Sequence, residues 1–232
     1  MQNAEGGGTT IAPNTWVAIK GSSLAPAGDT RIWQGSDFVS GQMPSQLDGV
    51  GVTMNGENAY LYYISPTQVN VLTPPDLAPG AVQVKVTTGG VTSASFTAQA
   101  QQESPSFFIF GAGPYIVGTH SNGTDLGPAS LYPGLTTPAQ PGEVVTLYAN
   151  GFGPISPPVV PGSAVQSGSL PALPVVQIGG FPAIVQFAGL VSPGLYQFNV
   201  VVPASAPNGD NAITATYNGF STQAGTLLTV QR

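Results

Sequence analysis

The side chains that could do chemistry in this sequence begin with its single histidine, His120, which stands in the segment THSNGTD. A serine-histidine-aspartate triad would have to use this histidine, and Asp125 is the nearest acid along the chain. A lone histidine in a loop rich in glycine and asparagine is usually solvated, and no GxSxG segment marks a nucleophile. We therefore expect no catalytic residue and no enzymatic activity.

Carboxylates could support glycoside hydrolysis or bind calcium. A glycosidase needs two carboxyl groups close together, but the ten acidic residues of this chain are scattered among predicted loops. Calcium prefers loop oxygens, and the segments SNGTDLG and PNGDNA offer Asn122, Asp125 and Asp210 as candidate ligands. Both segments also fit ordinary turns, in which Asn-Gly supplies a positive φ. The prediction is no metal site and no cofactor.

Four aromatic residues could form a binding surface: Trp16, Trp33, Tyr60 and Tyr62. Aromatic faces stack on the apolar faces of sugar rings, so these four residues are the candidate ligand-binding set. In the alternative, Trp33 packs on a sheet edge, and Tyr60 and Tyr62 lie against a neighbouring domain. A flat row of exposed rings would favour carbohydrate recognition, and rings buried between domains would favour a structural role.

The composition limits the elements that can carry these residues. Of 232 residues, 31 are glycine and 23 proline, which suits short strands and tight turns and leaves little room for long helices. Charged residues make up only 6% of the chain, and its 4 basic residues are too few to bind nucleic acid or an anionic membrane surface. No apolar run is long enough to insert into a membrane, and the absence of cysteine excludes disulfides. The predicted class is all-β.

The first half of the chain recurs in the second, which indicates an internal duplication. Three segments match in order: PNTWVAIKGSSLAP from Pro13 with PGEVVTLYANGFGP from Pro141, VTMNGENAYLYY from Val52 with VQIGGFPAIVQF from Val176, and QVNVLTP from Gln68 with QFNVVVP from Gln197. Each reads as a strand, or a pair of strands with a tight turn. Each repeat is therefore expected to be one complete folding unit.

Alternation along the strands predicts which side chains face the core. The residues predicted to point inward are Val17, Ile19, Val82, Val84, Val86, Val200 and Val202. The repeat aligns Tyr63 with Phe187, which predicts Tyr63 in the core and Tyr60 and Tyr62 on the outer face.

These motifs resemble the TIG/IPT group of immunoglobulin-like domains. They are most similar to a largely uncharacterised tandem module at the C-terminal end of many secreted acidobacterial proteins. The resemblance spans about residues 11–232 and implies two tandem immunoglobulin-like β-sandwich domains that carry no catalytic residues. The expected organisation is a flexible tail over 1–10, one domain over 11–102 and a second over 103–232. The second carries an extra N-terminal segment, 107–140, whose apolar runs predict added strands or a brace.

The sequence thus predicts a non-catalytic extracellular structural or adhesive module, acting as a rigid spacer or a surface assembly unit. Its expected partners are other extracellular domains or further copies of itself. The alternative is a carbohydrate-binding accessory module of a larger secreted protein, with a polysaccharide as partner. Secretion or display at the cell surface is expected, with a signal peptide or a larger upstream region preceding these residues in the full-length product.

Overall fold

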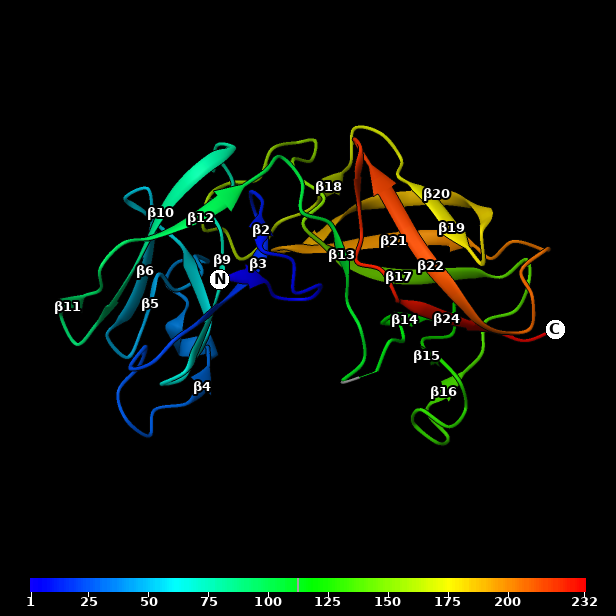
Figure 1. Ribbon diagram of the computed structural model, residues 1–232, viewed down its shortest axis with the longest axis horizontal. Coiled ribbons are helices and arrows are strands. Elements are labelled where there is room, and N and C mark those ends of the chain that lie inside the picture. Colours follow the sequence, from blue (N-terminus) through cyan, green and yellow to red (C-terminus); the bar gives the residue numbers. More distant parts are fainter. Residues whose placement is uncertain (112) are drawn as a thin grey trace.

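The computed structural model describes residues 1–111 and 113–232, and these residues form an all-β structure. Its one helical element is a single turn of 3-10 helix, η1 (Gly35–Asp37). None of the described helical residues makes a segment with the length and apolar character needed to cross a membrane. The composition therefore predicted the fold class correctly. Figure 1 shows the strands in two groups, with the N-terminus near the middle and the C-terminus at the far end of the second group.

The N-terminal group, here called the N-terminal half, consists of two facing sheets. One has the order β1 (Gln2–Asn3), β3 (Trp16–Lys20), β9 (Gln68–Leu72), β8 (Tyr60–Ile64) and β4 (Arg31–Ile32). The other has the order β2 (Thr10–Ile11), β12 (Phe96–Ala100), β10 (Gly80–Thr88), β6 (Val50–Met54) and β5 (Gln46–Leu47). The short strands β7 (Glu57–Asn58) and β11 (Val91–Thr92) pair with β6 and β10.

The C-terminal half forms one continuous hydrogen-bonded path, because the long strand β20 (Phe181–Ser192) pairs with two different neighbours. The path is β16 (Thr136–Thr137), β15 (Asp125–Leu126), β14 (Gly118–Thr119), β17 (Val144–Asn150), β21 (Leu195–Val201), β20, β19 (Val175–Ile178), β22 (Gly209–Tyr217) and β23 (Phe220–Ser221). Three further strands pair with members of this path: β13 (Ser106–Phe107) with β17, β18 (Gly168–Ser169) with β20, and β24 (Leu227–Val230) with β22.

The two halves repeat the same strand register. In the first, Val17 pairs with Val71, which pairs with Leu61. In the second, the aligned residues Val145, Val200 and Val185 pair in the same way. The aligned Gln-x-Asn segments also make the same contact, because Gln68 Nε2 donates to Asn70 Oδ1 at 2.8 Å and Gln197 Nε2 donates to Asn199 Oδ1 at 2.9 Å.

Two separate hydrophobic cores lie within these sheets, one from Ile11 to Ala100 and the other from Phe107 to Val230. All seven valine and isoleucine residues predicted to face inward are buried. Tyr63 is the exception to the predicted pattern, because it is only partly buried and stays outside the core. Leu61 and Ile64 are the β8 residues that enter the N-terminal core instead, since the pairing of β8 with β9 skips Tyr62 in a β-bulge.

The segment 1–10, expected to be a flexible tail, is instead folded onto both halves. Gln2 and Asn3 pair with β3, and Asn3 is only 2% exposed. The Asn3 side chain explains this order, since its Nδ2 donates to the Ser104 carbonyl at 2.7 Å and its Oδ1 accepts from Ser106 Oγ at 2.9 Å. Short polar residues at the joint thus hold the segment in place.

The extra segment 107–140 adds the strand β14, which extends the sheet beside β17, followed by β15 and β16. Its apolar residues Phe107 and Ile116 are fully buried in the C-terminal core. Tyr115 forms a bridge to Leu227 of β24, so the segment also covers the other end of that core.

Candidate functional site

Three of the four predicted aromatic residues lie together. Trp16, Trp33 and Tyr62 are mutual neighbours, with ring centroids 5.1 to 5.7 Å apart and interplanar angles of 61 to 86°. Rings at these angles meet edge to face, so they form the walls of a hollow instead of a flat row.

The β-bulge in β8 sets the direction of Tyr62. A bulged residue is left out of the ladder and can present its side chain differently from its neighbours. The Tyr62 carbonyl accepts a hydrogen bond from the Trp33 backbone N–H at 2.8 Å, which places the two rings side by side. Gln186 occupies the same bulged position in β20 of the second half. The repeat therefore places an aromatic side chain at this bulge in one half and an amide in the other.

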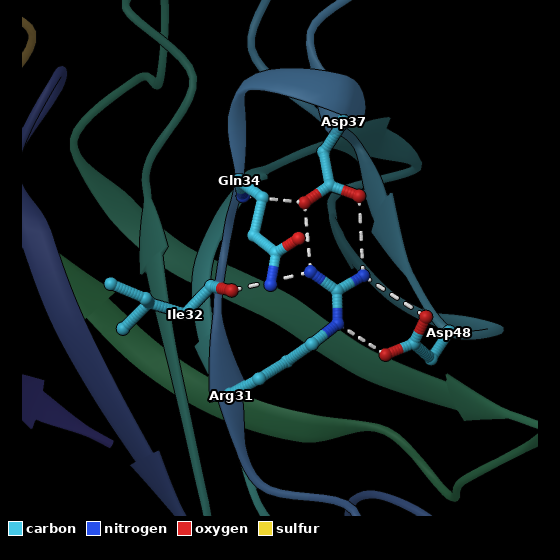
Figure 2. Close-up of polar contacts among 5 residues, drawn as sticks. All are labelled: Arg31, Ile32, Gln34, Asp37 and Asp48. Carbon is cyan, nitrogen blue, oxygen red and sulfur yellow. Dashed lines mark hydrogen bonds and ion pairs between the residues drawn. The ribbon is translucent and has the colours of Figure 1, made fainter.

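The loop after β4 carries more of the site, and Arg31 holds it in place. Figure 2 shows the Arg31 guanidinium between two carboxylates, Asp37 in η1 and Asp48 beyond the loop. Asp37 Oδ2 also accepts the Gln34 backbone N–H at 2.6 Å. The hydrogen bonds from Arg31 lower the pKa of both aspartates. Two of the acids that were predicted to be scattered among loops are therefore joined by Arg31. We call Arg31, Asp37 and Asp48 the Arg31 clamp, and no sequence pattern indicated it.

A cavity of about 460 Å³ lies between the two halves at this cluster, and we call it the aromatic cavity. Its aromatic walls are Trp16, Trp33, Phe38, Tyr62 and Phe108. Phe38 comes from the clamped loop, with its ring 5.0 Å from that of Trp33. The C-terminal half contributes Phe108 together with Ala164, Ser192, Pro193 and Leu195.

Trp16 joins the aromatic cavity to the C-terminal half. Its indole Nε1 donates to the Pro193 carbonyl at 2.8 Å. Gly194 follows in a left-handed conformation with φ of +66°, and a Cβ there would lie 2.6 Å from the indole ring. A glycine is therefore required for the C-terminal half to approach the tryptophan this closely.

Glu5 supplies the one carboxylate of the aromatic cavity. Among the described residues that line it, Glu5 is the single acid, and lysine, arginine and histidine are absent. Burial raises the pKa of the Glu5 carboxyl from 4.5 to about 7. The site therefore combines aromatic faces with an acid that is costly to ionise without a positive partner.

Tyr60, the fourth predicted aromatic residue, lies outside the aromatic cavity. It packs beside Gly162 of the C-terminal half, where an added Cβ would lie 2.8 Å from the Tyr60 ring. Burial raises the pKa of the Tyr60 hydroxyl. Its placement between the halves matches the structural alternative that the sequence left open.

His120 is bound by protein groups instead of being free in solvent. Its Nδ1 lies 2.5 Å from Glu143 Oε1, and its Nε2 lies 2.9 Å from Thr137 Oγ1. The acid beside the histidine is therefore Glu143, because Asp125 is held in β15 opposite Thr119. Glu143 Oε2 also accepts the Gln140 backbone N–H at 2.9 Å. These contacts fasten the loop before β17 to the β14–β15 hairpin.

The candidate calcium ligands do not come together as a ligand set. Asn122 Oδ1 accepts from the Thr124 backbone and hydroxyl, which is the geometry of an Asx turn. The two carboxylate oxygens of Asp210 accept from Tyr115 Oη at 2.9 Å and Thr229 Oγ1 at 2.6 Å. Within residues 1–111 and 113–232, no three histidine, aspartate or glutamate side chains are grouped to hold a metal ion.

Comparison with known proteins concerns mainly the fold. No curated protein matches the sequence. The solved structures with some likeness include SGBP-B of the Bacteroides ovatus mixed-linkage glucan utilization locus, in complex with a mixed-linkage heptasaccharide (13% identity, TM-score 0.30, 100% of this chain and 44% of that chain). The Escherichia coli adhesin FdeC has 12% identity and a TM-score of 0.31, covering 97% of this chain and 62% of that one. A tandem of titin Ig domains has 11% identity and a TM-score of 0.27, covering 96% and 90%.

The chain spans less than half the length of SGBP-B and 17% of the plexin A4 extracellular region that also shows likeness. At these TM-scores the likenesses support no conclusion about function. The more specific finding is a match of residues 8–102 to the family described as the IPT/TIG domain. A TIG/IPT immunoglobulin-like domain is therefore present in the N-terminal half of this chain.

Proposed function

We propose that this chain is a non-catalytic extracellular structural module whose two immunoglobulin-like units, residues 11–102 and 103–232, act as one rigid spacer. The units arise by internal duplication and present their outer ends to other extracellular domains. The observation that carries the proposal is the contact of Asn150 with Trp16 across the joint.

Asn150 binds the backbone of β3 as a neighbouring strand would. Its Oδ1 accepts the Trp16 N–H at 3.0 Å, and its Nδ2 donates to the Trp16 carbonyl at 3.0 Å. Asn150 is fully buried, so neither partner can exchange this contact for water without opening the joint. Removing one partner of a buried hydrogen bond costs about 1–3 kcal/mol, which makes reorientation of the halves unfavourable.

Backbone hydrogen bonds at a second place limit rotation about the first. The Met43 N–H donates to the Gly162 carbonyl at 2.7 Å, and the Ala164 N–H donates to the Gly41 carbonyl at 2.9 Å. Nearby, Asn14 Nδ2 donates to Gln166 Oε1 at 2.9 Å. Contacts at separated points fix an angle between two bodies, whereas a single linker would leave them free to pivot.

The end of β17 packs closely on Ser104, which lies in the segment that links the halves. Gly151 has a φ of +78°, and a Cβ on it would lie 2.1 Å from the Ser104 carbonyl oxygen. The Gly151 carbonyl in turn accepts the Ser104 N–H at 2.8 Å. The linking segment is thus bound to the end of β17 at Ser104.

The carbohydrate-binding alternative receives less support from the aromatic residues. A polysaccharide platform uses ring faces that lie in one plane, whereas Trp16, Trp33 and Tyr62 meet at steep angles between the halves. Export is supported by the surface, since a chain with 6% charged residues must cover itself with uncharged polar groups.

The rigid spacer is tested by residual dipolar couplings of the whole chain. We expect one alignment tensor to fit the amides of both halves. The Asn150→Ala variant should require two tensors or show lowered stability, because it leaves the Trp16 backbone unpaired. The matched control is Asn199→Ala, whose side chain bonds Gln197 within the C-terminal half. Two independent tensors in the unaltered chain would refute the proposal.

Light scattering across concentration tests the assembly role separately. A growing particle would indicate a surface assembly unit, and a constant monomer mass would restrict the role to that of a spacer. A monomer whose halves tumble independently would contradict both.

A further inference from the structure

The aromatic cavity has a chemical character that a spacer does not require. Five aromatic side chains and one carboxylate enclose about 460 Å³ between the halves, a size within the range of small-molecule sites. A joint that served packing alone would be filled by apolar side chains, because empty space forfeits dispersion contacts. An open cavity lined in this way is therefore a candidate ligand-binding site.

The rings favour a cation over a neutral sugar. The electron-rich faces of tryptophan and tyrosine attract a positive charge within about 6 Å of the ring centre, and tryptophan does so best. Trp16 and Trp33 both line the cavity, at 73° to each other and joined by Tyr62. The Trp16 N–H is already committed to Pro193, so the exposed part of that indole acts through its ring.

Glu5 gives the cavity its charge preference. It is the single charged residue among the described lining residues, so its carboxylate has no positive neighbour within the site. No hydrogen bond to the Glu5 carboxylate occurs among the described contacts, and Glu5 is anchored through its backbone N–H to Asn3 Oδ1 at 3.0 Å. A ligand that brings positive charge would offset the desolvation that burial imposes on this carboxylate.

We expect the positive charge of the ligand to be a quaternary ammonium group, in which all four substituents of the nitrogen are carbon. A primary ammonium carries three N–H donors that each need an acceptor, and an aromatic wall offers few. A quaternary ammonium has no donor and presents an apolar, diffusely charged surface that fits against several ring faces at once.

We propose that the aromatic cavity between the two halves binds a small quaternary ammonium compound, held by Trp16, Trp33 and Tyr62 and neutralised by Glu5. Binding at this position would bridge the N-terminal segment, the clamped loop and the C-terminal half. The ligand would therefore stabilise the joint, although the proposal does not depend on the joint being rigid.

The test is a titration with choline and with its uncharged carbon isostere, 3,3-dimethylbutan-1-ol. The chain contains two tryptophans and both line the cavity, so intrinsic fluorescence reports on this site directly. We expect a saturable change with choline and about thirtyfold weaker binding of the isostere, since a desolvated cation–π contact is worth about 2 kcal/mol. Ethanolamine, the primary amine, should bind more weakly than choline.

Variants separate charge from shape. Glu5→Gln should weaken choline about tenfold while leaving the isostere unchanged, since it removes the charge and keeps the size. Glu57→Gln makes the same change at an exposed position outside the cavity and should leave both affinities unaltered. Trp33→Leu should weaken choline, and a circular dichroism spectrum will show whether that variant folds.

The pH dependence gives an independent readout. Burial raises the pKa of Glu5 to about 7, and Tyr62 is the other titratable side chain lining the cavity. Choline affinity should therefore rise as the pH passes from below to above this pKa, and the rise should vanish in Glu5→Gln. Equal affinity for choline and its isostere would overturn the proposal by showing an apolar pocket. The absence of any saturable signal would overturn it as well.

Discussion

At the scale of single residues, Glu5 has properties that its sequence neighbours do not suggest. It stands before three glycines in a segment expected to be a flexible tail, where an acid would be fully solvated. The pairing of Asn3 with β3 draws Glu5 between the halves, and burial raises its pKa to about 7. A carboxyl with a raised folded-state pKa binds its proton more tightly when folded, so ionisation opposes folding.

Glu5→Gln should therefore change the pH dependence of stability. Between the usual value of 4.5 and about 7 the folded chain holds the proton that the unfolded chain has released, so the free energy of unfolding falls as pH rises. We expect equal melting temperatures for the variant and the parent below 4.5. The variant should become the more stable as pH rises to about 7. Parallel melting curves at all pH values would contradict a buried Glu5, and Glu57→Gln is the exposed control.

At the scale of elements, the loop between β4 and β5 depends on the Arg31 clamp. The loop carries Trp33, Phe38 and Met43 to the aromatic cavity, and Arg31 joins Asp37 within it to Asp48 beyond it. Arg31→Ala should free the loop. We expect faster amide exchange over residues 35–43 and a changed Trp33 emission, with the two cores intact. Lys85→Ala, which removes an exposed positive charge on β10, is the control and should change neither readout.

The same clamp should open in acid. Arg31 lowers the pKa of Asp37 and Asp48 below the ordinary value of 3.8, so their stabilising effect is present above that value and is lost as pH falls through the folded-state values. This sign is opposite to that of Glu5, which destabilises at high pH. The protection of the loop amides, taken relative to their intrinsic exchange rates at each pH, should fall only at acidic pH in the parent and be low at every pH in Arg31→Ala. Low protection at neutral pH in the parent would rule out the clamp.

The elements also show what the sequence could and could not predict. Alternation identified the inward valines of β10 correctly because a regular strand reverses its side chains at every residue. The prediction for Tyr63, made from its alignment with Phe187, was wrong, because a bulge adds one residue to β8 and shifts all later side chains. Aligning the repeats could not reveal this, since both halves carry the bulge at the same place.

Only some of the residues that line the aromatic cavity could be predicted from the sequence. Trp16, Trp33 and Tyr62 stood out by type, but the strand order that brings β3, β8 and β4 into one sheet was not predicted. Glu5, Phe38 and Phe108 lie in a predicted tail, a loop and the extra segment, where position depends on contacts between the halves. No local pattern encodes such contacts. A partly buried acid beside three glycines gives no periodic signal.

At the scale of the whole molecule, the joint relies on glycine at Gly194, where the two halves approach closely. Gly194 has a φ of +66°, and a side chain there would strike the Trp16 ring. Gly180, in the turn between β19 and β20, has a similar φ of +80° but open space around it. The two positions share the backbone requirement and differ in the contact between halves.

Gly180→Ala should therefore lower the free energy of unfolding only by the cost of a left-handed alanine, about 1–2 kcal/mol. Gly194→Ala should lower the free energy of unfolding by more, because the added methyl must displace Trp16 and break its hydrogen bond to the Pro193 carbonyl. Urea unfolding should show the larger loss for Gly194→Ala, together with a shift in tryptophan emission that Gly180→Ala lacks. Equal decreases in the free energy of unfolding and unchanged emission in both variants would mean that the halves can move apart at Trp16 with no loss of stability. The joint would then be a hinge, and the rigid-spacer role would lose its physical basis.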